Sequence, residues 1–398
     1  MIVNKNNKYK QLLEPFYINN FKLKNRFVLS PMTLHLTTKD GKMTQEEIAY
    51  AKRRAYSAPL QITGGAYIDD FGQLFEYSYS AKSDEDIKSL AQLAAAMKTS
   101  ENKVILQLAH AGKFSKASLN KYGYTYGPSY EKHHWPFEHE VFEMSKEQIK
   151  DVVLAYQKAT LRAIKAGFDG VEISMAQKLL IQTFFSQIIN KRSDEYSSQN
   201  FENRCRLALE IVKAIRQTIN ENAPQDFIFG FRATPEETYG SELGYTIDDF
   251  NKLMDLIIKE GAISYLAIAS WGHNIYLNKV RSESKFKGEL VNKVVYQHIN
   301  HKVPVIASGG INTPQKCLDA LKYSDLIGLS SVFVADPEFV SKIENDEIDK
   351  INLKITQDQL LDLAIPQHSF SGVVNMFGYC ETIPNETMNA LENNANNN

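Results

Sequence analysis

The 398-residue chain is poor in cysteine and has no long apolar run. Its three cysteines, Cys205, Cys317 and Cys380, lie far apart and are odd in number, which argues against a disulfide framework and against a clustered zinc or iron–sulfur motif. No segment approaches the roughly 20 apolar residues that cross a bilayer, and no apolar run of signal-peptide length follows Met1. We therefore expect a cytoplasmic protein that makes no membrane contact.

An excess of charge of one sign is also lacking. The 45 lysines and arginines nearly balance the 47 aspartates and glutamates, and no basic block is long enough to form a nucleic-acid groove. Neither G-x-G-x-x-G nor G-x-x-x-x-G-K-[ST] occurs, which leaves a separate Rossmann or P-loop domain without support. Since 43% of the residues are hydrophobic, the chain can bury a sizeable core, and a small molecule is the expected partner.

Short β-rich apolar runs alternate with longer segments of helical periodicity. Helix start signals support several of these segments, such as Ser145 three residues before Gln148, and Thr313 before Pro314. The expected strands cover residues 27–32, 60–66, 103–108, 169–174, 227–231, 265–268, 303–308 and 326–329. The expected helices include residues 84–99, 146–166, 200–219, 246–260 and 313–321. Eight alternating units predict an α/β fold, a (β/α)8 TIM barrel, with a doubly wound open sheet as the alternative.

One region interrupts the alternation inside the barrel. Residues 110–144 follow the third expected strand and are rich in glycine, serine and aromatic residues. An excursion at that place lies over the mouth of a barrel, so we interpret these residues as a cap. Residues 1–347 are therefore expected to form the barrel together with this cap.

Beyond residue 347 the chain has left the repeat, and residues 348–398 are expected to form a C-terminal extension. Residues 356–364 have a helical pattern, and SFSGVVNMFGYCETIP at 369–384 is expected to be an ordered aromatic segment. The final ENNANNN is strongly polar and is expected to be disordered.

Polar groups and glycines gather where the expected strands end, which is where α/β barrels carry their chemistry. Gln107 lies near the end of the third strand and Arg232 follows the fifth, and both suit a ring with amide-like edges on which negative charge develops. Gly309 and Gly310 follow the seventh strand and precede a helix, so their amides suit a phosphate. Each also has a simpler interpretation: a core amide for Gln107, an ion pair with Glu236 for Arg232, and a tight turn without a ligand for the glycines.

Seven stretches of the sequence form a recognisable set. They are LKNRFVLSPMT (23–33), LQLAHAGK (106–113), AGFDGVEI (166–173), NKRSDEY (190–196), FENRCRLALEIV (201–212), PVIASGGI (304–311) and DLIGLSSVFVADPEFV (325–340). In this order and at these strand ends, they resemble the Old Yellow Enzyme family of FMN-dependent oxidoreductases over about residues 10–345. The resemblance implies an eight-stranded barrel that holds FMN at its mouth, in agreement with the barrel expected from the periodicity.

The resemblance also implies the contacts of the flavin ring. Gln107 matches the family glutamine on the pyrimidine edge, and Arg232 matches the arginine near N1, where a cation stabilises the negative charge of the reduced ring. The residues that would back the ring are Pro31, Met32, Thr33 and Gly65.

The same resemblance places the phosphate on Gly309 and Gly310 and on the pair Ser330-Ser331. The family usually has Gly-Arg where this chain has Ser-Ser, so one charge-assisted contact is missing. Two hydroxyls and their backbone amides remain as hydrogen-bond donors, and FMN is still the expected cofactor.

The stretch VEISMAQKLL departs most from the family pattern E-[IF]-H-x-A-[HN]-G-Y-L. Ser174 and Gln177 stand where the family has the two residues that hydrogen-bond a substrate carbonyl, and Leu179 stands at the proton-donating tyrosine. Serine and glutamine still donate hydrogen bonds, but leucine donates no proton, so alkene reduction is expected to be weak. His35 is our candidate for a replacement acid, and a loop histidine without a catalytic role is the alternative.

We therefore expect an FMN-dependent oxidoreductase that takes hydride from NADH or NADPH and passes it to a small electrophilic acceptor in a ping-pong cycle. The acceptor classes are quinones, dioxygen and activated alkenes. A catalytically weak flavin-binding or scaffold protein is one alternative, which failure of NADH to bleach the flavin would favour. A tRNA-modifying flavoenzyme on a similar barrel is the other, which RNA binding at moderate salt would favour. No metal site is expected, and a homo-oligomer is left open.

Overall fold

The structure is a computed structural model that describes residues 8–134, 138–261, 263–371, 374 and 382–396. Eight parallel strands close into a barrel in the order β10-β13-β14-β15-β3-β4-β5-β9. The strands are β3 (Phe27–Leu29), β4 (Leu60–Tyr67), β5 (Lys103–Ala109), β9 (Gly170–Met175), β10 (Ile228–Ala233), β13 (Tyr265–Ile268), β14 (Val305–Ser308) and β15 (Leu326–Leu329). The predicted barrel is thus confirmed. Its first strand ends at Leu29 rather than at residue 32, since Pro31 has no N–H for the ladder.

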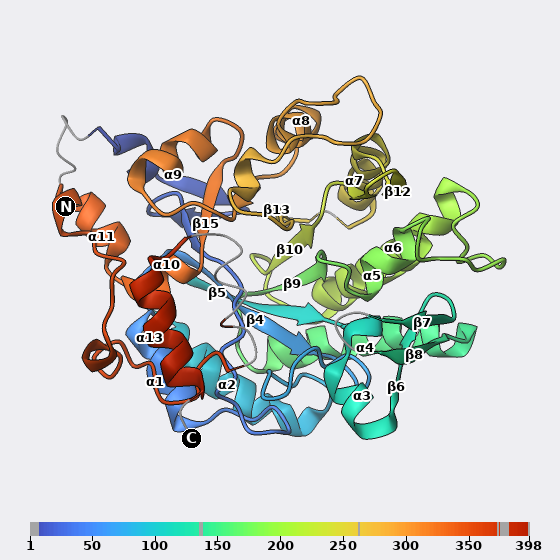
Figure 1. Ribbon diagram of the computed structural model, residues 1–398, viewed down its shortest axis with the longest axis horizontal. Coiled ribbons are helices and arrows are strands. Elements are labelled where there is room, and N and C mark those ends of the chain that lie inside the picture. The colour runs from blue at the N-terminus through green and yellow to red at the C-terminus, as the bar shows by residue number, and fades with distance from the viewer. Residues whose placement is uncertain (1–7, 135–137, 262, 372–373, 375–381, 397–398) are drawn as a thin grey trace.

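Helices surround the strands, which lie at the centre of Figure 1. Local signals explain several starts: Ser145 and Gln148 form a reciprocal capping box, and the hydroxyl of Thr313 accepts from the amide of Lys316. The outer helices are α1 (Gln45–Arg53), α2 (Ile87–Met97), α4 (Lys146–Lys165), α6 (Phe201–Asn222), α7 (Ile247–Gly261), α8 (Val291–Ile299), α9 (Pro314–Leu321), α10 (Ser331–Ala335) and α11 (Phe339–Glu344). None of the helices in the described part of the chain combines the length and the apolar character needed to cross a membrane.

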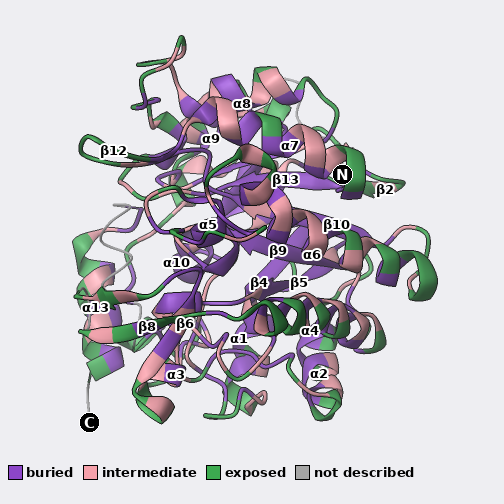
Figure 2. Cartoon of the chain, turned by 90° about the vertical axis from the view of Figure 1, so that its right-hand side faces the viewer, coloured by how far each residue is buried: buried purple, intermediate pink, exposed green. Residues whose placement is uncertain are grey.

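The interior of the barrel is closed at one end by an antiparallel hairpin, β1 (Phe16–Ile18) and β2 (Phe21–Leu23). Ile18 and Leu23 are fully buried against inward-facing strand residues such as Val28. Burial of each such side chain stabilises the fold by about 2 kcal/mol. Figure 2 shows that β4, β5, β9 and β10 are buried while the outer helices carry the exposed residues. The candidate active site lies at the other end of the barrel, where the strands have their carboxyl ends.

Residues 110–144, predicted as a cap, form a small domain-like insertion. It contains α3 (Lys116–Tyr122) and a three-stranded sheet of β6 (Tyr124–Gly127), β8 (His139–Glu143) and β7 (Glu131–His133). Helix α5 (Leu180–Phe185), which follows β9, contacts this insertion. A second hairpin, β11 (Glu237–Tyr239) and β12 (Glu242–Tyr245), follows β10.

The end of the chain is more ordered than its composition suggests. Helix α13 (Asn385–Asn396) includes most of the ENNANNN segment that was predicted to be disordered. That prediction was wrong because Leu391, Asn394 and Ala395 are all buried on one side of the helix, where Leu391 packs in a core cluster with Tyr50 of α1. Figure 1 shows α13 beside α1 and α10.

Two other predictions for the extension have different outcomes. Residues 356–364 form a short 3-10 helix, Gln357–Gln359, followed by turns, so a regular helix there is not observed. The capping box of Thr356 and Gln359 starts this turn, but the chain then reverses through Ala364, whose φ is +52°. Most of the predicted aromatic segment at 369–384 lies outside the described residues.

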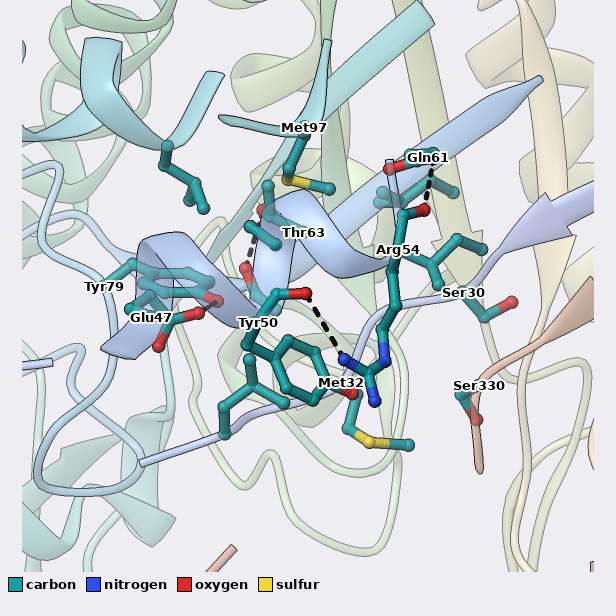
Figure 3. Close-up of a pocket in the computed structure, with 16 residues that line it drawn as sticks. Ser30, Met32, Glu47, Tyr50, Arg54, Gln61, Thr63, Tyr79, Met97 and Ser330 are labelled. Carbon is teal, nitrogen blue, oxygen red and sulfur yellow. Dashed lines mark hydrogen bonds between the residues drawn. The ribbon is translucent and has the colours of Figure 1, made fainter. Parts of the chain in front are cut away.

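Arg54, directly after α1, joins the extension to the barrel. Its guanidinium donates to the carbonyls of Phe333, Val334 and Leu363 at 2.9 to 3.0 Å, and it lies 3.6 Å from the ring centroid of Tyr50. Figure 3 shows the side chain of Arg54 against the ring of Tyr50, and Met32 and Ser330 line the same pocket. The arginine thereby fixes the carbonyl end of α10 and the extension to one place on the barrel wall.

Candidate active site

A cavity of about 260 Å³ opens at the carboxyl end of the barrel strands. All eight strands or the loops directly after them contribute to its wall. Of the residues predicted for the site, those that line it are Pro31, Met32, Thr33, Gly65, Gln107, Ser174, Gln177, Arg232, Gly309, Gly310, Ser330 and Ser331, together with Leu179. The structure therefore brings these side chains and glycines together in one place.

Glu172 lies beneath the polar side of the cavity and was not predicted. It is fully buried on β9, where its carboxylate accepts from Nε2 of Gln107 at 2.7 Å and from the hydroxyl of Tyr265 at 2.9 Å. Burial raises the pKa of Glu172, while the positive charge of Arg232 lowers it. The signal for this residue was a single carboxylate in the otherwise apolar strand GVEISM.

Gly230 makes this arrangement sterically feasible. It lies opposite Glu172 on one side and Tyr265 on the other in the strand register. A Cβ on Gly230 would lie 2.2 Å from Cζ of Tyr265, so the tyrosine ring passes where a side chain would be. The hydroxyl of Tyr265 thereby reaches Glu172 and helps to fix the carboxylate that accepts from Nε2 of Gln107.

Arg232 is the cation of the cavity wall. It lies opposite Ser174 in the ladder between β10 and β9. Burial lowers the pKa of Arg232, and the negative charge of Glu172 opposes that shift. A guanidinium in this setting keeps its charge, because its ordinary pKa lies far above neutral. The alternative pairing with Glu236 is not observed, since that carboxylate accepts from the amides of Arg281 and Ser282.

The glycine turn after β14 forms a compact backbone cradle. Gly309 and Gly310 have φ values of +90° and +82°, a region that side chains disfavour. A Cβ on Gly309 would lie 2.5 Å from Cδ1 of Ile275, and a Cβ on Gly310 would lie 2.5 Å from the carbonyl oxygen of His273. Only glycine therefore fits at these two positions, and both glycines line the cavity. Lys316 of α9 donates to the carbonyl of Gly310 at 3.2 Å and places a positive charge beside the turn.

The loop after β9 presents Ser174, Gln177 and Leu179 to the cavity. Gln177 has a φ of +57°, and its amide donates to the hydroxyl of Thr234 at 3.1 Å, which fixes the turn. Among the described lining residues, only Arg232 and Tyr67 are ionisable. The hydroxyl of Tyr67 donates to the carbonyl of Asp40 at 3.0 Å, and burial raises the pKa of this phenol.

His35, the predicted replacement acid, is not among the residues that line the cavity. Its ring lies 5.3 Å from that of Phe75, which does line the cavity. Burial and the charge of Lys116 lower the pKa of His35 to about 4. The imidazole is therefore neutral at pH 7 and has no proton ready to donate as an imidazolium.

Two segments contribute to the wall without having been predicted. The loop after β4 supplies Gly72, Leu74, Phe75 and Ser78, whereas the described residues of the 110–144 insertion supply none. Thr382 of the C-terminal extension also lines the cavity. Neither contribution could be predicted from local sequence patterns, because both depend on how distant loops fold back over the barrel.

The described residues fit FMN. The turn at Gly309 and Gly310 suits a phosphate, because both glycines line the cavity and Lys316 places a positive charge beside them. The buried amide of Gln107 and the guanidinium of Arg232 suit the polar edge of an isoalloxazine. The apolar backing by Pro31 and Met32 suits the face of such a ring.

Comparisons with known proteins specify the family. The family model described as NADH:flavin oxidoreductase / NADH oxidase matches residues 11–350. An uncharacterized oxidoreductase of Streptococcus pyogenes is 51% identical over 381 residues, which are 96% of each chain. The NADH:acrylate oxidoreductase of Vibrio harveyi is 30% identical over 386 residues, which are 96% of this chain and 38% of that protein. The solved old yellow enzyme homologue from Zymomonas mobilis has the same fold, with a TM-score of 0.71 at 21% identity over 84% of this chain and 93% of its own.

The chain belongs to the NADH:flavin oxidoreductase / NADH oxidase family. It is accordingly an oxidoreductase with FMN as cofactor and NADH or NADPH as reductant.

Proposed function

We propose that the protein passes electrons from NADH or NADPH, by way of FMN, to quinones or dioxygen faster than to simple α,β-unsaturated ketones. The observation that supports this is the composition of the cavity wall. Hydrogen-bond donors and one guanidinium are present, whereas the only other ionisable lining residue in the described chain is Tyr67, whose proton is committed to Asp40. Two buried free thiols, Cys205 and Cys317, are compatible with the reducing cytoplasm as the place of the reaction.

When bound, FMN would supply the chemistry of hydride transfer between the reduced nicotinamide and the acceptor. Arg232 supplies a positive charge that stabilises the reduced ring. Gln107 is held by Glu172 so that its carboxamide oxygen can accept from the ring, and Pro31, Met32, Thr33 and Gly65 form the backing. Gly309, Gly310, Ser330 and Ser331 hold the phosphate.

Ser174 and Gln177 bind the acceptor oxygen, because both are neutral donors on one side of the cavity. Reduction of an enone also needs a proton at carbon, and Leu179 has none to give. A quinone takes its protons on oxygen, where water can deliver them, and dioxygen does likewise. We assign His35 no part in the reaction, because it does not line the cavity and is neutral at pH 7.

The visible spectrum of the purified protein tests this proposal. FMN should be released on denaturation in about a 1:1 ratio to protein, and anaerobic NADH or NADPH should bleach the flavin band of the native protein. Benzoquinone added to the reduced protein should restore the flavin band within the mixing time of the experiment. A colourless protein that fails to bind added FMN, or a flavin that neither nucleotide reduces, would contradict the proposal and favour a scaffold.

A further inference from the structure

Thr382 belongs to the C-terminal extension, yet it lines the cavity of the barrel. It is 6% exposed, and its hydroxyl lies 2.6 Å from the hydroxyl of Ser331, the residue that opens α10. Ser331 also lines the cavity, so the two hydroxyls form one polar group on its wall. The extension therefore reaches into the site and does more than cover the outside of the barrel.

The position of Thr382 is fixed by contacts on both sides. Nδ2 of Asn312, two residues after Gly310, donates to the carbonyl of Thr382 at 3.0 Å. The extension is thus tied to the loop after β14 as well as to the loop after β15. Beyond Thr382, α13 packs in a core cluster with Tyr50 and Val334. Both segments that form the phosphate cradle therefore hold the same residue of the extension.

The chemistry of a hydroxyl pair determines what this group can bind. One hydroxyl donates its proton to the other, and the accepting hydroxyl keeps its own proton for a further acceptor. Because Thr382 and Ser331 line the same cavity as Gly309 and Gly310, and Asn312 ties Thr382 to the loop that contains these glycines, that acceptor is an anion held by the glycine turn. A hydrogen bond to a charged oxygen is stronger than one between neutral groups.

We propose that the C-terminal extension supplies Thr382 as a ligand of the FMN phosphate, through its hydroxyl pair with Ser331. This inference rests on the proposed phosphate site. It assigns to the extension a direct part in cofactor binding, at the place where the chain has serine and no arginine.

The experiment compares FMN with riboflavin, which differs only in lacking the phosphate. Apoprotein is titrated with each, and binding is followed by quenching of flavin fluorescence. Thr382→Val keeps the shape of the side chain and removes the hydroxyl, so FMN affinity should fall about tenfold or more while riboflavin affinity stays unchanged. Thr382→Ser keeps the hydroxyl and should restore the affinity for FMN.

Thr387→Val is the matched control, because it removes another buried hydroxyl of the same extension. Thr387 donates to the carbonyl of Leu353 at 2.6 Å and does not line the cavity. Any loss of affinity in this variant should be equal for FMN and riboflavin. An FMN-to-riboflavin affinity ratio that is the same in Thr382→Val and in the wild type would overturn the inference. A wild-type protein that binds both flavins equally would instead contradict the phosphate site itself.

Discussion

Replacement of Glu47 by glutamine should change the pH dependence of stability. Glu47 lies on α1 and is 1% exposed, and its carboxylate accepts from the hydroxyl of Tyr79 at 2.5 Å. It lines a small cavity behind Met32, which Figure 3 shows. Burial raises the pKa of Glu47 from 4.5 to about 7, and the bond from Tyr79 opposes this shift only in part.

The sign of the effect follows from the two pKa values. Below pH 4.5 the carboxyl is protonated in the folded and in the unfolded chain, and above pH 7 it is ionised in both. Between these values the unfolded chain gives up the proton while the folded chain retains it, so wild-type stability falls as the pH rises. At about 1.4 kcal/mol per pKa unit, the shift removes about 3 kcal/mol of stability by pH 8.

Glutamine has no proton to lose and can still accept from Tyr79. The free energy of unfolding of Glu47→Gln, minus that of the wild type, should therefore be about 2.5 kcal/mol larger at pH 8 than at pH 5, because at pH 5 the unfolded carboxyl is already partly ionised. Urea denaturation followed by circular dichroism at both pH values measures this difference, in which the other ionisable groups cancel. Glu46→Gln, an exposed neighbour on the same helix, should show no such change. A relative stability of Glu47→Gln that is the same at both pH values would refute the reasoning.

Two further variants separate the structural from the functional cations. Arg54→Met leaves buried carbonyls of α10 and the extension without their donor and should destabilise the protein by about 3 kcal/mol in urea denaturation. Arg53→Met removes the partly exposed neighbour and should cost about 1 kcal/mol or less. Equal losses would contradict the role of Arg54 in joining the extension to the barrel. Arg232→Met should slow flavin reduction by NADH about 100-fold, as measured by stopped-flow absorbance. The fold should remain intact, because Glu172 keeps Gln107 and Tyr265 as hydrogen-bond donors. An unchanged rate would mean that Arg232 has another role.

The barrel was predictable because each of its strands carries its own apolar run and several of its helices have their own start signals. Strand ends of a closed barrel must meet at one mouth, so placing Gln107 and Arg232 on strand ends was enough to bring them together. The tail was mispredicted for the opposite reason. ENNANNN is polar in isolation, and only tertiary packing of Leu391 and Ala395 against the barrel wall makes the helix favourable.

Contacts between segments that are distant in the chain could not be predicted from the sequence. The bond between Ser331 and Thr382 joins residues 51 positions apart, and no local pattern specifies it. The placement of His35 beside Phe75 likewise depends on the path of the loop after β4. Glu172 is different, since a carboxylate within a fully buried strand already indicates a buried polar network.

Transfer of electrons from the reduced protein to two acceptors tests the central claim most directly. Protein reduced anaerobically with one equivalent of NADH is mixed with benzoquinone or with cyclohexenone, and reoxidation of the flavin is followed by absorbance. Without a positioned acid, the enone should react about 10²- to 10⁴-fold more slowly than it does with one. Benzoquinone should therefore reoxidise the wild type far faster than cyclohexenone does. The variant that restores the family donors should gain rate with the enone and little with the quinone; its changes are Ser174→His, Gln177→His and Leu179→Tyr. Rapid reoxidation of the wild-type protein by cyclohexenone, unchanged in the triple variant, would contradict the account.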